Sequence, residues 1–221
     1  MPEKIIFAWS GGKDSALAFY ELLHGNYEIL ALLTTLTEDF DRISMHGVRR
    51  SLLLKQAKAI GMPLEKMYIA KDSPCKEYQD RMADVLGCYK AKGVLSAAFG
   101  DVYLVDVRKY REQMLAKIGM KGIFPLWKRS GAEIAEKFID LGFKAIIVCV
   151  DSKVLGKEFV GRIFDRKFLK DLPNGIDPCG ENGEFHSFVF DGPIFKKPVK
   201  YEKGEIVLRD NRFYFCDLIP A

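Results

Sequence analysis

The residues whose types and spacing could do chemistry begin close to the N-terminus. Ser10–Ser15 read Ser-Gly-Gly-Lys-Asp-Ser and follow directly after the apolar run Ile5–Trp9. We expect that run to form a strand and a helix to begin at or near Ser15, so that backbone N–H groups and a helix N-terminus converge at this segment. Gly11 and Gly12 carry no Cβ, can adopt positive φ, and let the backbone approach a phosphate closely. The sequence therefore predicts an anion-binding loop at Ser10–Ser15, which we call the phosphate loop.

The side chains of the phosphate loop fit the phosphates of a nucleotide. The hydroxyls of Ser10 and Ser15 add hydrogen-bond donors, and Lys13 can lie along the phosphate chain as a mobile cation. Asp14 is unsuited to direct phosphate contact and better suited to holding Mg²⁺ or to orienting the loop. The alternative is a tight strand-to-helix turn in which Ser15 only caps the helix. That alternative explains the two glycines but not the Lys-Asp pair, so we favour a nucleotide site.

Two common nucleotide-binding motifs are absent. No G-x-x-x-x-G-K-[ST] run occurs in the chain, which excludes a Walker A loop. No G-x-G-x-x-G follows the first predicted strand, which argues against a dinucleotide-binding fold. The phosphate loop must therefore belong to another class.

The elements that position the phosphate loop alternate between β-type runs and helical patterns. The β-type runs are Ile5–Trp9, Ile29–Leu36, Leu64–Ile69, Val94–Phe99, Gly122–Leu126 and Ala145–Val150. The apolar helical stripes are Ala16, Phe19, Tyr20 and Leu23, and later Ile134, Phe138 and Leu141. Their spacing is that of a buried helix face. The alternation predicts an α/β fold in which βαβ units form a parallel sheet with helices on both faces.

The pattern changes near Leu172. A dense run of turn formers without a helical period follows, at Pro173–Gly175, Asp177–Pro178 and Glu181–Gly183. Beyond it, Glu205–Leu208 and Arg212–Asp217 flank Asp210-Asn211 and predict a β-hairpin. We therefore expect a nucleotide-binding α/β domain over residues 1–150, followed by a small β-rich C-terminal region over residues 151–221.

Composition places the chain among ordinary globular proteins. Of its 221 residues, 48% are hydrophobic and 29% are charged, which favours neither disorder nor a coiled coil. The net charge of +4 is mildly basic without a dense basic run, and by itself neither requires nor excludes nucleic acid. The 5 cysteines are scattered, with no C-x-x-C pair that would indicate zinc. No apolar run is long enough for a signal peptide or a membrane span, so we expect a cytoplasmic protein.

The phosphate loop resembles the PP-loop of the N-type ATP pyrophosphatases. All fixed positions of the S-G-G-x-D-S motif match within Ser10–Ser15. The resemblance implies an adenine nucleotide alpha hydrolase-like fold with ATP as the co-substrate. It also implies that AMP is transferred to an oxygen of an acceptor, with release of pyrophosphate, before a nucleophile displaces the AMP. Lys13 and Asp14 are then candidate catalytic residues, with Mg²⁺ as the expected metal ion.

Four further segments resemble the diphthine ammonia ligase family, and the similarity spans nearly the whole chain. They are Met45–Arg49, Ala98–Asp101, Phe159–Arg162 and Cys179–His186. The resemblance implies that the chain uses ATP and ammonia to amidate a carboxylate, the family's acceptor being elongation factor 2 that carries diphthine. Residues 151–221 would then bind the acceptor. Asn182 departs from the family pattern, in which glycine is usual at this position.

Two carboxylates, Glu181 and Glu184, lie in the turn-rich segment. Such a pair can bind a cationic group, hold a metal, or orient ammonia as it loses a proton, although by composition alone a solvated acidic turn is the simpler interpretation. The family resemblance reverses that preference. It makes Glu184 a candidate catalytic residue and Glu181 and Asn182 candidate substrate-binding residues. His186 alone reads as a satisfied histidine at the start of a strand, and the resemblance makes it a candidate for acceptor binding or proton transfer.

Four more candidate substrate-binding residues lie near the ends of predicted elements. His46 and Arg49 stand at the start of the predicted second helix, where a cation is unfavourable unless an anion occupies the site. A solvated Arg49 with Ser44 as the helix cap is an equally good interpretation. Gly100 and Asp101 follow the fourth predicted strand, where ligands of parallel sheets bind. Asp101 could instead cap the helix that follows.

Two other functions remain open. An RNA sulfur transferase shares the PP-loop but needs an accessible cysteine persulfide or a metal-cysteine site, and Cys179 is the only cysteine in a suggestive place. No separate basic RNA-binding region is present, so we do not expect a nucleic-acid partner. The second alternative is a nucleotide-binding module that signals without turnover. We expect no membrane partner, and a homodimer stays open.

Overall fold

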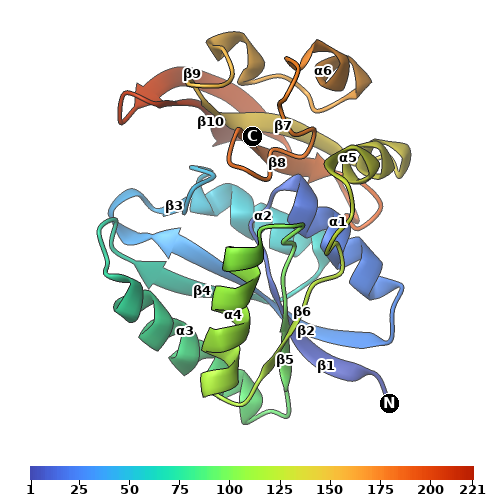
Figure 1. Ribbon diagram of the computed structural model, residues 1–221, viewed down its shortest axis with the longest axis vertical. Helices are drawn as coiled ribbons and strands as arrows, with labels where there is room; N and C mark the ends of the chain where they lie inside the picture. The colour runs from blue at the N-terminus through green and yellow to red at the C-terminus, as the bar shows by residue number, and fades with distance from the viewer.

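A parallel sheet forms the N-terminal part of the molecule (Figure 1). The structure is a computed structural model that describes residues 1–221. The parallel strands are β1 (Glu3–Ala8), β2 (Tyr27–Thr37), β4 (Leu64–Ile69), β5 (Ser96–Ala98) and β6 (Lys121–Ile123). They lie in the order β4-β2-β1-β5-β6, and the short β3 (Arg42–Ile43) pairs antiparallel with β2. The predicted α/β class with a parallel sheet is confirmed.

Helices cover both faces of this sheet. They are α1 (Lys13–Leu23) and α2 (Arg50–Ile60) on one face, and α3 (Cys75–Lys90) and α4 (Val105–Lys117) on the other. Because successive side chains of a strand point to opposite faces, β1 contributes to two cores. Ile5 and Phe7 lie in the core that includes α1 and α2, and Ile6 lies in the core that includes α3 and α4. No helix is both long and apolar enough to cross a membrane.

A second, antiparallel sheet forms the C-terminal part. Its strands are β7 (Lys144–Asp151), β8 (Phe185–Asp191), β9 (Tyr201–Arg209) and β10 (Phe213–Pro220). They lie in the order β8-β7-β10-β9. The remaining helical elements are η1 (Glu38–Phe40), α5 (Gly131–Asp140), η2 (Lys157–Phe159) and α6 (Arg166–Asp171). A β-rich region therefore follows the α/β part, as predicted.

The strand predicted at Ala145–Val150 forms, but in the other sheet. It is β7, which pairs antiparallel with β8 and β10, so its expected place as the last strand of the parallel sheet is wrong. Seven of its 8 residues are buried. A strand covered on both faces is a continuous apolar run in either kind of sheet, so the run could not tell the two apart. The division of the chain at residue 150 stays a prediction.

The predicted hairpin is present and longer than expected. Its strands, β9 and β10, flank Asp210 and Asn211, which have φ of 50° and 49°. Asparagine and aspartate tolerate this left-handed conformation, which a tight hairpin turn demands at both central residues. The dipeptide therefore identified the turn correctly, and only the strand ends were underestimated.

The phosphate loop follows β1 at the point where the strand order reverses. The chain passes from β1 to β2 on one side of β1 and returns from β4 to β5 on its other side. Ligands of open parallel sheets bind beyond the carboxyl ends of the strands at such a point. Figure 1 shows α1 and α2 between the two sheets, and the backbone N–H of Val189 in β8 donates to Gly11 O at 2.9 Å. The loop is thus enclosed between the two sheets.

Candidate active site

The phosphate loop is built as an anion site. Gly11 has φ of 77°, a conformation that favours glycine, and Gly12 is the N-cap of α1. Ser10 Oγ accepts from Gly12 N at 3.2 Å and donates to Ser15 Oγ at 3.1 Å. The N–H groups of Gly11, Asp14 and Ser15 donate no hydrogen bond within the protein. Free N–H groups at a helix N-terminus are donors for an anion.

Gly100 keeps this donor group open. A Cβ at residue 100 would lie 3.0 Å from Ser15 N and 3.1 Å from the carbonyl carbon of Asp14. A side chain there would crowd the first turn of α1. The structure therefore brings Gly100, which sequence reasoning placed at the site, directly against the phosphate loop.

Lys13 joins the phosphate loop to the C-terminal region. Its side chain is only 3% exposed, and Nζ donates to Asp14 Oδ2 at 2.8 Å and to the carbonyl oxygen of Cys179. Burial acts to lower the pKa of Lys13, but Asp14 and the other negative groups around it outweigh that effect and raise the pKa above its ordinary value. Lys13 is therefore a buried, fully charged ammonium between two regions of the chain.

The turn of residues 177–184, which we call the acidic turn, carries the two predicted glutamates. Glu181 Oε1 accepts from the backbone N–H of Val102 at 2.9 Å. Burial, then nearby Asp14 and Asp101, raise the pKa of Glu181 to about 7, although the Val102 hydrogen bond and Lys13 oppose the shift. A carboxyl group that titrates near neutral pH can exchange a proton during a reaction.

Glu184 has different surroundings. Its Oε1 accepts from Asn182 Nδ2 at 2.9 Å and from the backbone N–H of Asp177 at 3.3 Å. Its Oε2 is buried without a hydrogen-bond partner, and the residue is 7% exposed. Asn182, the departure from the family pattern, thus serves as a donor to Glu184.

The two predicted histidines lie together beside the phosphate loop. The ring centroids of His46 and His186 are 4.7 Å apart, and His46 Nδ1 is 3.1 Å from the carbonyl oxygen of Ser187, to which it must donate. Burial lowers the pKa of His46 to about 4 and, together with His46 and Lys13, lowers that of His186 well below its ordinary value. Both rings are therefore neutral near pH 7. His46 also lies before α2, which begins at Arg50, so its predicted place at the start of that helix is wrong.

Two of the charged residues predicted to bind substrate, Arg49 and Asp101, form ion pairs within the protein. Arg49, the N-cap residue of α2, pairs with Asp217 of β10 at 2.6 Å between Nη2 and Oδ2. Asp101 pairs with Arg111 of α4 at 2.5 Å and does not cap that helix, whose N-cap is Leu104. The helix caps considered for the sequence, Ser44 and Asp101, are both wrong, whereas Arg49 is partly solvated, with 43% of its side chain exposed, while it forms its ion pair.

Four residues to which the sequence analysis gave no functional role organise the site. Gln56, fully buried on α2, donates to Gly11 O at 3.0 Å and to Val189 O at 2.7 Å. Ser187 Oγ accepts from Lys13 N at 3.1 Å, and Asp177 Oδ2 accepts from Tyr103 Oη at 3.0 Å. Only Gln56 could have been noticed in the sequence, because it is a glutamine within the apolar face of a helix.

A magnesium ion would depend on Asp14 and on the nucleotide. No three His, Cys, Asp or Glu side chains are grouped so as to hold a metal ion by themselves. Mg²⁺ in nucleotide sites is held by one or two carboxylates together with phosphate oxygens and water. Asp14 is the only carboxylate of the phosphate loop, and its side chain is 26% exposed. The donor set therefore fits a nucleotide-bound Mg²⁺.

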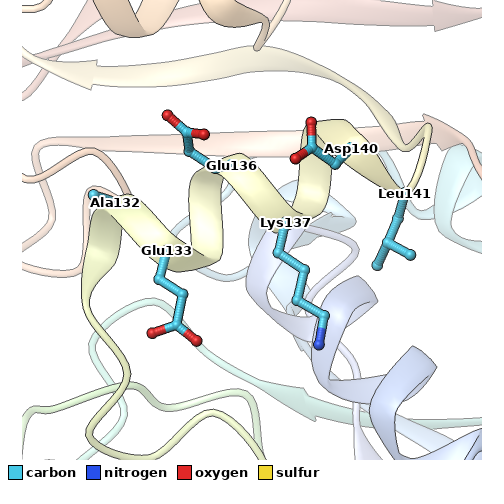
Figure 2. A pocket seen from close by; sticks show the side chains of 6 residues that line it. All are labelled: Ala132, Glu133, Glu136, Lys137, Asp140 and Leu141. Atoms are coloured by element: carbon cyan, nitrogen blue, oxygen red, sulfur yellow. The ribbon is translucent and has the colours of Figure 1, made fainter.

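A surface hollow lies away from this site. Figure 2 shows this hollow, about 550 Å³ in volume, on the side of α5. Its lining residues are Ala132, Glu133, Glu136, Lys137, Asp140 and Leu141. None of them belongs to the phosphate loop or the acidic turn. The hollow is open and lined mostly by charged side chains, so we assign it no role in the site.

Comparison with known proteins covers both parts of the chain. Residues 3–122 match the model of the diphthamide synthase N-terminal domain, and residues 130–217 match that of the diphthamide synthase C-terminal domain. The diphthine–ammonia ligase of Danio rerio is 25% identical over 94% of this chain and 90% of its own length. That of Bos taurus is 24% identical over 90% of this chain and 82% of its own. The Schizosaccharomyces pombe ligase is 23% identical over 92% of this chain and 37% of its own.

Proposed function

The chain belongs to the diphthamide synthase family, and from this premise we propose that it is an ATP-dependent ligase that adenylates an acceptor carboxylate and then forms an amide with ammonia. One observation carries the proposal. The ammonium of Lys13 contacts Asp14 in the phosphate loop and Cys179 in the acidic turn. A site for phosphates and a site rich in carboxylates therefore meet at one buried cation.

The phosphate loop serves ATP in this proposal. The free N–H groups of Gly11, Asp14 and Ser15 would receive phosphate oxygens, with Ser10 and Ser15 hydroxyls beside them. Lys13 would offset negative charge as pyrophosphate departs. Asp14 would hold Mg²⁺, which supplies further positive charge at the phosphates when bound.

The chemistry explains why adenylation must come first. A carboxylate is a poor electrophile because its leaving group would be oxide. One carboxylate oxygen attacks the α-phosphorus of ATP, the bond between the α- and β-phosphates breaks, and pyrophosphate leaves. Ammonia then attacks the acyl carbon, AMP leaves with the bonding electron pair, and one proton is released. Glu181 and Glu184 stand on the acceptor side of this sequence, with Asn182, His46 and His186 around them.

The acceptor that we propose is elongation factor 2 carrying diphthine, in the cytoplasm. The support for diphthine is the name shared by the relatives of Danio rerio and Bos taurus, whose alignments cover most of both chains. Elongation factor 2 as the carrier of diphthine follows from the family resemblance of the sequence. The whole length of the acidic turn and β8 falls within the match to the C-terminal domain. We infer that this second region receives the acceptor, as a monomer or as a homodimer.

Product analysis tests the proposal. The protein is incubated with ATP, Mg²⁺, ammonium chloride and elongation factor 2 carrying diphthine, and the nucleotides are separated. We expect AMP and pyrophosphate in amounts equal to the amide formed, and none without the acceptor. ADP with phosphate would contradict the proposal, and so would the absence of any cleavage, which a signalling module would give.

Cys179 argues against the RNA sulfur transferase. Its thiol is buried and donates to Gly131 O at 3.1 Å, and burial raises its pKa above the ordinary value. A persulfide carrier needs an accessible, easily ionised thiol. The ligase is therefore the better interpretation of the same phosphate loop.

A further inference from the structure

Glu181 and Glu184 are 3 positions apart, but their carboxylates face different parts of the molecule. Both hydrogen bonds to Glu184 Oε1 come from its own turn, from Asn182 and Asp177. The hydrogen bond to Glu181 Oε1 comes from Val102, in the segment after β5 and 79 residues away. Glu184 therefore closes the acidic turn, whereas Glu181 reaches across to the parallel sheet.

That reach brings Glu181, on the acceptor side of the site, close to the phosphate loop. Strand β5 lies beside β1, so the segment after β5 adjoins the phosphate loop. The charged groups that act on Glu181 come from both elements: Lys13 and Asp14 from the start of α1, and Asp101 from the segment after β5. From its own turn, the backbone N–H of Glu181 is held by Asp177 Oδ2 at 2.9 Å. Its second carboxylate oxygen, Oε2, has no hydrogen-bond partner and is not fully buried.

The amide-forming step needs such a group. When ammonia attacks the acyl carbon of the adenylate, the new C–N bond leaves a positive charge on nitrogen. That nitrogen must lose a proton before the intermediate collapses to a neutral amide and AMP. A positioned base within reach of the reacting nitrogen contributes about 100-fold to 10,000-fold to such a step.

We propose that Glu181 is the catalytic base of amide formation and that Glu184 is a positioning residue that holds the acidic turn. This inference rests on the proposed ligase function. The proton passes from the attacking nitrogen to Glu181 Oε2, the C–N bond forms, and the C–O bond to AMP breaks with its electron pair on AMP. The carboxylate becomes a carboxylic acid and returns the proton to water after the products leave.

The neighbouring groups are less suited to this role. His46 donates through Nδ1 to Ser187 O, and burial lowers the pKa of its ring to about 4, so it binds protons weakly. Glu184 has one oxygen engaged and the other enclosed. Glu181 has a free oxygen and a pKa raised to about 7, close to the pH at which a base is most effective.

Comparison of two nucleophiles, ammonia and hydroxylamine, distinguishes the loss of a catalytic base from damage to the rest of the site. The variant Glu181→Gln keeps an oxygen for Val102 N–H, so the acidic turn should stay in place. Hydroxylamine is used beside ammonia because it is the weaker base, so its nitrogen, once it has attacked, loses a proton to water far more readily. Glu136→Gln, an exposed substitution on α5, is the matched control (Figure 2).

With ammonia, we expect Glu181→Gln to form amide at least about 100-fold more slowly than wild type. With hydroxylamine, we expect the hydroxamate to form within about 10-fold of the wild-type rate, because adenylation is intact. Glu136→Gln should match wild type with both nucleophiles.

Equal losses with both nucleophiles would overturn the inference, because Glu181 would then act in adenylation or in folding. An unchanged rate with ammonia would overturn it as well. Failure of wild type to release pyrophosphate with either nucleophile would instead remove the proposed function, and this inference with it.

Discussion

The phosphate loop and the acidic turn are opposite in what they offer a ligand. The phosphate loop presents donors, namely the free N–H groups at the start of α1 and the ammonium of Lys13. The acidic turn presents an acceptor, Oε2 of Glu181, which has no partner, whereas the partner-free Oε2 of Glu184 is buried. A donor-rich surface suits phosphates, and an acceptor-rich surface suits the N–H groups of a nitrogen nucleophile. In the proposed function, ATP therefore binds at the phosphate loop and ammonia binds at the acidic turn.

Removal of the Lys13 side chain, which contacts both the phosphate loop and the acidic turn, should have the largest effect. Its removal leaves Asp14 and the carbonyl of Cys179 without their shared cation in a buried place. We expect Lys13→Ala to lower the free energy of unfolding by about 3 kcal/mol, as for other broken buried pairs. ATP affinity should fall too, because the phosphates lose a cation. Urea denaturation and calorimetry measure the two effects.

Lys137→Ala is the matched control for this prediction. Lys137 also pairs with a carboxylate, Glu21, at 2.5 Å, but its side chain is 38% exposed. Exposed pairs contribute less than about 1 kcal/mol, so this variant should keep nearly full stability and full ATP affinity. Equal losses in both variants would show that Lys13 has no special place between the two regions.

Glu184→Gln affects the acceptor side alone. Glutamine keeps the size of the side chain but removes the negative charge that receives Asn182 Nδ2 and Asp177 N. A hydrogen bond to a charged group contributes about 2 kcal/mol, which corresponds to about 30-fold in the rate of amide formation. ATP affinity should stay within about 2-fold of wild type, because the phosphate loop is untouched. A fall in ATP affinity as large as that of Lys13→Ala would contradict the division of roles.

Gly100→Ala affects the phosphate side alone. The new Cβ would lie 3.0 Å from Ser15 N, so the first turn of α1 must shift by a few tenths of an ångström. We expect ATP affinity to fall about 10-fold, equivalent to about 1.4 kcal/mol. Gly87→Ala in α3 is the control, because nothing lies within 4 Å of its new Cβ. That variant should gain up to about 1 kcal/mol of stability and bind ATP normally.

Asp217→Asn should have the smallest effect. The carboxylate joins β10 to the first part of the chain through ion pairs with Arg49 and Arg42. The hydrogen bond from Arg49, with a further one from Arg42, lowers the pKa of Asp217, although burial opposes the shift. Because the folded pKa is depressed, its contribution is present above the unfolded pKa and is lost as pH falls through the folded value. The pairs are partly exposed, so we expect less than about 1 kcal/mol. Stabilities of wild type and variant should differ at pH 7 and converge as the pH falls below the ordinary range of an aspartate pKa. A constant difference would exclude this role.

The phosphate loop could be predicted from the sequence because its conformation is local. A strand, two glycines, flanking serines and a helix start are contiguous, and each has a known backbone preference. The acidic turn could only be located as a run of turn formers. The order within the turn depends on the hydrogen bond from Tyr103 to Asp177, two residues that are 74 positions apart in the chain. Likewise, Ser187 accepts a hydrogen bond from the backbone N–H of Lys13, which is 174 positions away.

The same limit explains the misplaced strand and the missed glutamine. β7 is apolar along its length because it is covered on both faces, and that pattern carries no information about the direction of its neighbours. Gln56 bonds to Trp9, Gly11 and Val189, which no periodicity within α2 reveals. The conformation and chemistry of contiguous residues could be predicted from the sequence, whereas the contacts between distant segments could not.

The fate of the acceptor's carboxylate oxygen tests the central claim most directly. The acceptor, elongation factor 2 carrying diphthine, is prepared with oxygen-18 in the carboxylate and incubated with the protein, ATP, Mg²⁺ and ammonium chloride, and the nucleotide products are examined by mass spectrometry. If the phosphate loop and the acidic turn form one adenylating site, each amide formed leaves one oxygen-18 atom in AMP. Oxygen-18 in inorganic phosphate, or AMP without the label, would contradict the account.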